Sequence, residues 1–165
     1  MRNSKMKGFT LIELIVVIAI IGVLAAILVP SMIGYVGDSK YGTANSNAKL
    51  AYTNTATWCT KCEVSGKSVQ DAKFDVADLS ATVSVDEIAY DGGKTDDLGK
   101  ALCNLMGGKT GSGIACGELK GQSPKWTQWA KSKDDQYIGS YPTEASAKNK
   151  ATWGTELTPK AASGT

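Results

Sequence analysis

Apolar residues are concentrated near the start of the chain. From Phe9 to Val29 there are 21 residues, of which only Thr10 and Glu13 carry polar side chains. As an α-helix this segment would be about 31 Å long, at about 1.5 Å per residue, which matches the hydrocarbon thickness of a bilayer. Three basic residues lie in the preceding segment 1–8, so the positive-inside rule keeps the N-terminus in the cytoplasm and sends the rest of the chain outward. The pattern predicts one membrane-spanning helix.

The apolar pattern continues after Pro30 with a helical period. Apolar or small residues recur about every 3.6 positions, at Ile33, Val36, Ala44, Ala48, Ala51, Thr55 and Trp58. Lys40 is the one residue that interrupts this pattern. We therefore expect one long helix over about residues 9–58, whose part over 30–58 is amphipathic. Its buried face would carry small residues, which lets a sheet pack closely. Several Asn and Thr residues weaken its intrinsic helix propensity, so it requires tertiary support.

Residues 59–157 carry the shorter signals of a β-rich globular head. A helix is expected from Thr95, with two aspartates in its first turn, and glycines 107 and 108 end it. Strands over 125–130 and 136–141, joined by a polar run, should form an antiparallel hairpin. The tail over 158–165 is expected to be disordered. The predicted fold class is α+β, a long N-terminal α-helix packed on a small globular head.

Composition and charge exclude several functions. The formal net charge is +2, but without the first eight residues it is −1, and no basic stripe remains to bind nucleic acid. Histidine is absent, which removes the commonest general base and the commonest metal ligand. No nucleophile–base pair or phosphate-binding loop is evident. We expect no enzymatic activity, no metal and no cofactor.

The junction Lys7-Gly8-Phe9, followed by Thr10-Leu11-Ile12-Glu13 and the apolar run, resembles the processing site and stalk of type IV prepilins. A secretory signal peptide would have a shorter apolar core with a small-residue cleavage site after it. An ordinary membrane anchor does not account for Glu13. The resemblance implies that a prepilin peptidase cuts between Gly8 and Phe9 and methylates the new amine of Phe9. It also implies the type IV pilin fold.

Further roles follow from this resemblance. Glu13 would pair with the Phe9 amine of a neighbouring subunit, and Gly22 and Pro30 would bound a hinge that loses helicity in the fibre. The chain would be a structural subunit of a type IV pilus, a helical homopolymer used for adhesion or motility. Its other partners would be membrane lipid before assembly, the prepilin peptidase, an assembly platform and a motor ATPase. The precursor would be a single-pass protein of the cytoplasmic membrane, and the pilus extracellular.

Two other functions are compatible with parts of the sequence. A pseudopilin of a type II secretion or DNA-uptake system shares the first 30 residues, but builds a short rod instead of a surface filament. The calcium loop often found in secretion pseudopilins has only a poor counterpart here, at residues 134–135. A membrane-tethered thiol oxidoreductase would use Cys59 and Cys62, although a thioredoxin-like motif belongs in a βαβ context that is missing.

The four cysteines are expected to form two disulfides, because an exported domain meets oxidising conditions. We favour Cys59–Cys62 with Cys103–Cys116, which would close the loop over 107–113. The other two pairings, which would tie the end of the long helix to the later segment, remain open. A zinc site of four thiolates fits less well, since the second pair is separated by 12 residues.

The head is rich in aromatic residues, most of which should fill its core. Exposed Trp126 or Trp129 could instead stack on the sugar rings of a polysaccharide or host-surface ligand, since a flat apolar ring with a polar tip suits a wet binding surface. The two rings should point to opposite faces of one strand, so at most one is expected to be free.

Overall fold

The computed structural model describes residues 9–81, 83, 88–92, 95–106 and 113–159. The predicted leader over 1–8, the predicted helix end at residues 107–108 and most of the predicted tail lie outside these ranges. The chain divides into two compact units, Met1–Val36 and Gly37–Thr165. From here on we call the second unit the head; it includes the part of the long helix from Gly37 onward as well as the globular residues 59–157.

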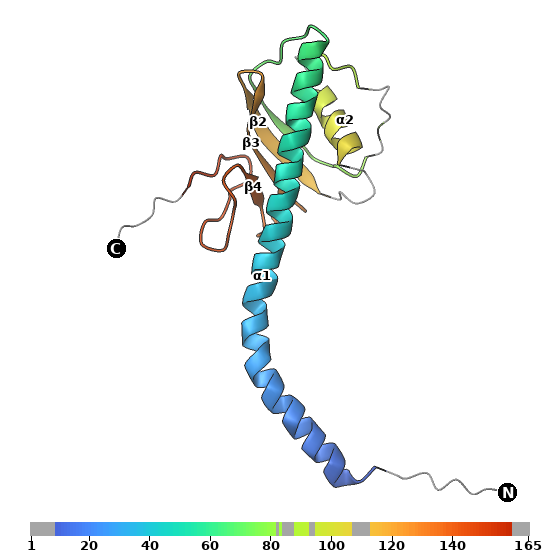
Figure 1. The fold of residues 1–165 in the computed structure, drawn as a ribbon, viewed down its shortest axis with the longest axis vertical. Helices are drawn as coiled ribbons and strands as arrows, with labels where there is room; N and C mark the ends of the chain where they lie inside the picture. Colours follow the sequence, from blue (N-terminus) through green and yellow to red (C-terminus); the bar gives the residue numbers. More distant parts are fainter. Residues whose placement is uncertain (1–8, 82, 84–87, 93–94, 107–112, 160–165) are drawn as a thin grey trace, which may run out of the picture. The chain divides into compact units, whose positions relative to one another are not determined.

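Helix α1 spans Leu11–Val64, which confirms the long N-terminal helix and contains Pro30 (Figure 1). It ends later than the predicted Trp58, because a glycine-based cap closes it. Gly66 has a left-handed φ of 73°, and its amide donates to the Glu63 carbonyl at 2.9 Å. The Lys67 amide donates to the Cys62 carbonyl, also at 2.9 Å. These two bonds form a Schellman motif, a stop signal that Gly66 already offered in the sequence.

The head contains a four-stranded antiparallel sheet in the order β1-β2-β3-β4. The strands are Ala72–Val76 (β1), Ile114–Lys120 (β2), Ser123–Ala130 (β3) and Gly139–Tyr141 (β4). Strands β3 and β4 confirm the predicted hairpin. Gly121 and Gln122 join β2 to β3 with φ values of 59° and 64°, as a two-residue type I′ turn requires.

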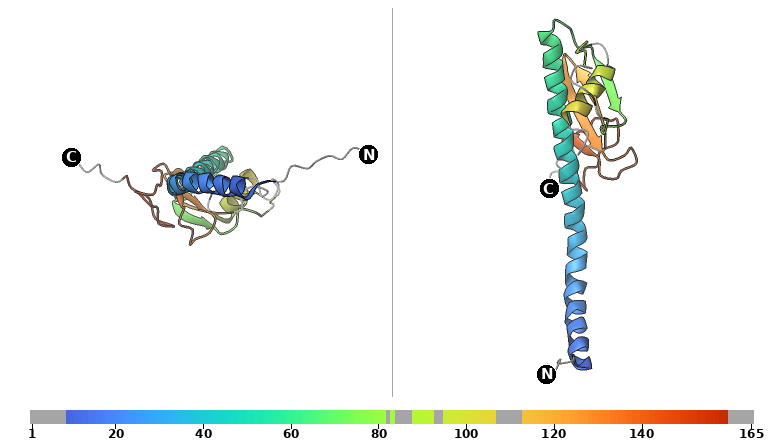
Figure 2. Two further views of the ribbon diagram at one scale, coloured as in Figure 1. Left: turned by 90° about the horizontal axis from the view of Figure 1, so that it is seen from below. Right: turned by 90° about the vertical axis from the view of Figure 1, so that its right-hand side faces the viewer.

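The part of α1 that belongs to the head covers one face of this sheet. Helix α2 (Thr95–Leu105) lies beside α1 and contacts β1 (Figure 2). The helix predicted from Thr95 is thus confirmed. The main core combines small residues of α1 with larger side chains of α2 and the sheet, among them Ala48, Trp58, Leu98, Leu102 and Trp129. Ile33 and Val36, predicted on the buried face, are exposed instead. The α+β fold class is confirmed.

Candidate functional site

The start of α1 places Thr10 and Glu13 in a reciprocal hydrogen-bonded cap. The Thr10 amide and hydroxyl both donate to Oε2 of Glu13, at 2.9 and 2.7 Å, and the Glu13 amide donates back to Oγ1 of Thr10 at 3.3 Å. This is a capping box, which satisfies backbone donors that a helix start leaves free. The Thr-x-x-Glu spacing is the sequence signature of this cap. Glu13 therefore also has a role within its own chain.

Between Phe9 and Val36 the large apolar side chains lie uncovered. Each is at least 47% exposed, and Phe9 reaches 85%. A window of α1 near the N-terminus, with a hydropathy of 3.2, is long and apolar enough to cross a membrane. A continuous apolar surface of this size on a soluble protein would mark an interaction site. This segment therefore needs lipid or protein around it.

Gly22 and Pro30 both lie inside α1, which runs through each of them. Proline removes one backbone donor from the helix and glycine lowers its propensity. The Ser31 hydroxyl donates to the Leu28 carbonyl at 2.8 Å, close to the proline. The hinge predicted for this stretch concerns the fibre and stays a prediction.

In the head, α1 and the sheet approach each other through small residues and one buried amide. Asn45 is 8% exposed, and its Oδ1 accepts from the amides of Ser140 and Ala145, each at 3.0 Å. Its Nδ2 donates to the Ala145 carbonyl at 2.8 Å. The Thr127 hydroxyl donates to the Ala48 carbonyl at 2.7 Å. These contacts attach β3, β4 and the following loop to α1, as the small residues on its buried face predicted.

All four cysteines are free, buried thiols, so neither expected disulfide is present. Cys59, Cys62 and Cys103 belong to the main core, whereas Cys116 points to the opposite face of the sheet from its neighbour Ala115, which packs in that core. The favoured Cys103–Cys116 bridge is therefore wrong, because the sheet separates the two side chains. Within the described residues no three His, Cys, Asp or Glu side chains are placed to hold a metal ion.

Burial also sets the chemistry of these thiols. It raises the pKa of Cys59 to about 11, with the neighbouring Cys62 contributing, and it raises the pKa of Cys62 as well. A catalytic thiol needs the opposite change, a lowered pKa in an accessible, electropositive setting. The Cys59–Cys62 pair therefore does not support a thiol oxidoreductase.

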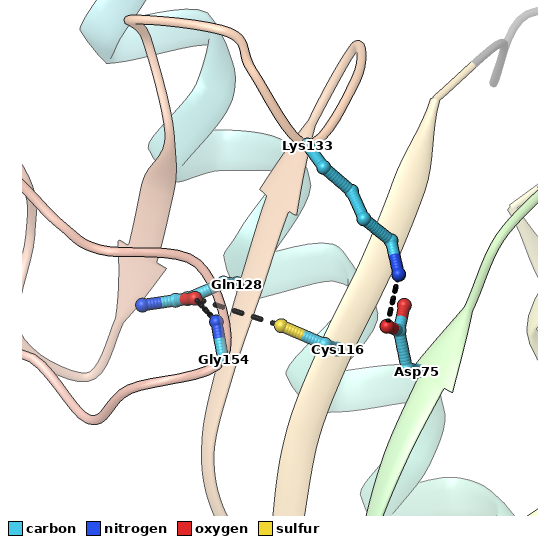
Figure 3. Close-up of polar contacts among 5 residues, drawn as sticks. All are labelled: Asp75, Cys116, Gln128, Lys133 and Gly154. Atoms are coloured by element: carbon cyan, nitrogen blue, oxygen red, sulfur yellow. Dashed lines mark hydrogen bonds and ion pairs between the residues drawn. The ribbon is translucent and has the colours of Figure 1, made fainter.

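Cys116 lies beside a buried glutamine that holds the C-terminal segment (Figure 3). Oε1 of Gln128 accepts from the Gly154 amide at 2.8 Å and from Sγ of Cys116 at 3.5 Å. Its Nε2 donates to the carbonyls of Thr152 and Thr155, at 3.0 and 2.7 Å. Figure 3 shows this cluster in front of the strands, with α1 behind them and the exposed Asp75–Lys133 ion pair of 2.6 Å nearby. The Gln128 side chain thus holds the segment 152–155 against the face of the sheet that is turned away from α1.

Neither tryptophan proposed for ligand stacking is free. Trp126 and Trp129 are 2% and 6% exposed, and the Trp126 indole donates to Oε2 of Glu118 at 2.9 Å. Neither ring is therefore available to stack on a sugar, because both faces of the sheet are covered. Trp129 packs against α1 in the main core, whereas Trp126 lines a small cavity with Cys116 and Trp153.

Residues 3–29 match the family model described as the prokaryotic N-terminal methylation motif. Over 111 residues the chain is 36% identical to the fimbrial protein of Moraxella nonliquefaciens, covering 67% of this chain and 62% of that protein. Over 51 residues it is 51% identical to the type IV major pilin protein PilA of Myxococcus xanthus, covering 31% and 23%. The type IV major fimbrial protein FimA of Dichelobacter nodosus is 41% identical over 69 residues, covering 42% of each chain.

The chain thus spans less than two thirds of the length of each of these relatives. No solved structure matches the chain significantly.

Proposed function

We propose that this chain, a member of the type IV pilins, is a structural subunit of a type IV pilus and polymerises through its N-terminal helix. One observation carries the proposal: an apolar helical surface that lies exposed from Phe9 to Val36 and has one carboxylate, Glu13, near its start. Burying such a surface is worth about 25 cal/mol for each Å² removed from water. Lipid covers it in the precursor, and copies of the same helix cover it in the fibre.

Processing between Gly8 and Phe9 supplies the charge that assembly needs. A prepilin peptidase removes the basic leader and methylates the new amine of Phe9, which stays cationic. The methylation motif over residues 3–29 supports this step. Before cleavage the Phe9 nitrogen is a neutral amide, so the precursor offers Glu13 no cationic partner.

The capping box leaves one oxygen of Glu13 available. Both bonds from Thr10 reach Oε2, while Oε1 accepts no hydrogen bond from any residue that the structure describes. A carboxylate within a membrane helix costs about 2.5–3.5 kcal/mol at the bilayer centre, and an ammonium a similar amount. Pairing Oε1 with the Phe9 amine of a neighbouring subunit removes both penalties and sets the axial register. The capping box through Oε2 and the ion pair through Oε1 can then form at the same time.

The remaining partners follow from this route. The precursor sits in the cytoplasmic membrane with its N-terminus inside, and the assembled pilus is extracellular. Extraction of the helix from lipid requires an assembly platform and a motor ATPase. Gly22 and Pro30 would let the helix loosen locally as subunits pack, since neither supports a rigid helix there.

Glu13→Gln tests this mechanism, because glutamine keeps the capping acceptor and removes the charge. We expect mass spectrometry to show normal cleavage of the leader. Electron microscopy of sheared material should show a filament yield of about one tenth of the parent's or less. Thr10→Val is the matched control: it removes the hydroxyl cap, keeps the carboxylate and should reduce the yield less. Native filaments from Glu13→Gln, or mature subunits that still begin at Met1, would contradict the proposal.

A further inference from the structure

The head contains a cavity of about 310 Å³ between α1 and the connection from β3 to β4. Side chains of both elements line it, among them Lys40, Thr43, Trp129, Lys131, Asp135 and Tyr137. Binding pockets for small molecules run from about 300 to 1,000 Å³, so this one suits a ligand with a single ring. We call it the loop pocket. The exposed apolar segment over 9–36, which contains Glu13, does not contribute to it.

Aromatic side chains give the loop pocket a firm apolar wall. Tyr137 packs edge-on against Tyr41, with ring centroids 5.2 Å apart, and the Tyr41 hydroxyl donates to the Gln136 carbonyl at 3.1 Å. Trp129 is held in the core and turns its small exposed part, 6%, to the pocket. Rings fixed in this way lose little conformational entropy when a ligand packs on them.

The charges around the loop pocket favour one negative group. Lys40 lies with Nζ 4.8 Å from the centroid of the Tyr137 ring, while Lys131 makes no hydrogen bond or ion pair with any described residue. Asp135 is the one acidic side chain in the lining, and its Oδ1 already accepts from the Tyr137 amide at 3.0 Å. Two ammonium groups against one carboxylate leave a net positive lining. A ligand with a single carboxylate would balance it.

Acceptors on the same wall favour hydroxyl groups on that ligand. The Thr43 hydroxyl donates to the Ser39 carbonyl at 3.0 Å, so its lone pairs face outward as acceptors, and Asp135 has a second oxygen. A flat aromatic acid would leave these acceptors without donors. A sugar acid supplies the donors, the carboxylate and an apolar ring face together. We propose that the loop pocket binds one acidic sugar residue, a hexose ring with a carboxylate.

Saturation-transfer NMR on the full chain in detergent micelles tests this, with sodium glucuronate as the probe and glucose as the uncharged comparison. We expect transfer to glucuronate and much weaker transfer to glucose. Lys131→Gln should weaken glucuronate binding about fivefold, since the lost charge pair is partly exposed. Lys148→Gln makes the same charge change on an exposed residue outside the lining, and should bind as the parent does.

A second pair of variants tests the cavity itself. Thr43→Tyr should fill the loop pocket and abolish the saturation transfer to glucuronate. Ser46 is also an exposed residue of α1 but does not line the pocket, so Ser46→Tyr should leave the transfer unchanged. Equal binding of glucose and glucuronate, unaltered binding by Lys131→Gln, or absence of transfer from the folded parent chain to glucuronate would each overturn the proposal. Because no filament is formed in these samples, the outcome is independent of pilus assembly.

Discussion

Gly139 begins β4, where the strand backbone lies directly against the backbone of α1. A Cβ atom at this position would overlap the carbonyl carbon and oxygen of Ala44, which are backbone atoms of the helix and cannot turn aside. The amide of the next residue, Ser140, donates to Asn45. The absence of a side chain at Gly139 is thus what allows β4 to reach the helix.

Gly139→Ala should destabilise the head by about 1–3 kcal/mol or more, because the added methyl group forces helix and strand apart. Gly42→Ala is the control, since Gly42 lies in an exposed part of α1 with no atom within 4 Å of the added Cβ. Alanine there should stabilise the protein by up to about 1 kcal/mol. Denaturant unfolding of the full chain, followed by tryptophan fluorescence, measures both. Changes of the same sign in both variants would refute the close approach.

The burial of the thiols predicts that they react slowly with alkylating agents near neutral pH. Burial raises the pKa of Cys59 to about 11 and that of Cys116 to about 12, from an ordinary value of 9.0. Since the thiolate is the reactive form, iodoacetamide at pH 8 should modify native Cys59 about a hundredfold more slowly than unfolded Cys59. Mass spectrometry after timed quenching gives the rates. Equal rates in the native and unfolded states would contradict the burial.

The same raised pKa values fix the sign of the effect on stability. Between about pH 9 and 12 the unfolded chain loses its thiol protons while the native chain keeps them. The unfolded state then binds fewer protons, so the free energy of unfolding falls as the pH rises through this window. Replacing Cys116 by alanine should flatten this fall, which denaturant titrations at pH 8 and pH 10.5 would measure.

At the scale of elements, the contact between α1 and the sheet depends on Asn45 as much as on apolar packing. Its side chain joins residues that are 95 and 100 positions away in the chain. Small residues flank it, so the two backbones lie close and exclude water. A buried polar hub of this kind fixes one arrangement of helix and sheet, since any shift would leave its partners without hydrogen bonds.

Asn45→Ala should lower the stability of the head by about 2–4 kcal/mol, because two amides and one carbonyl lose their partner in a buried place. Asn54 offers a matched control on the same helix. Its Nδ2 is buried and has no hydrogen-bond partner among the described residues, so Asn54→Ala should be neutral or stabilising. Thermal unfolding by circular dichroism measures both. A similar loss in the two variants would show that the hydrogen bonds of Asn45 add nothing to the effect of the lost side-chain volume.

At the scale of the whole molecule, the two units differ in what surrounds their apolar side chains. The unit up to Val36 exposes all of its large described apolar residues. In the described part of the head, only Leu50, Val64 and Leu105 are exposed large apolar residues. The first unit therefore needs lipid or other subunits, and the head has a core of its own.

A fragment of residues 37–165 should accordingly fold as a soluble monomer, without detergent. We expect its melting temperature to lie within about 5 °C of the head transition in the full chain, because the main core lies inside the fragment. Size-exclusion chromatography and circular dichroism check this. The fragment should form no filaments. Aggregation or loss of the cooperative transition would mean that the first unit supports the fold.

Much of the fold could be predicted because the signals are local. The apolar run, the period over 30–58, the cap at Thr95 and the polar turn before β4 each predicted an element that the structure contains. The later end of α1 and its capping box at Thr10 and Glu13 were also readable from Gly66 and from the Thr-x-x-Glu spacing. The apolar period alone indicates neither of them.

The sequence by itself determined the long apolar helix and the position of the one carboxylate in its apolar run, because the transfer of consecutive apolar residues into lipid needs no distant partner. Only the tertiary structure decided which side chains meet. It put Cys116 and Cys103 on different sides of the sheet, buried both tryptophans, and gave Asn45 and Gln128 their partners. Those outcomes depend on contacts between residues far apart in the chain, which local patterns do not encode.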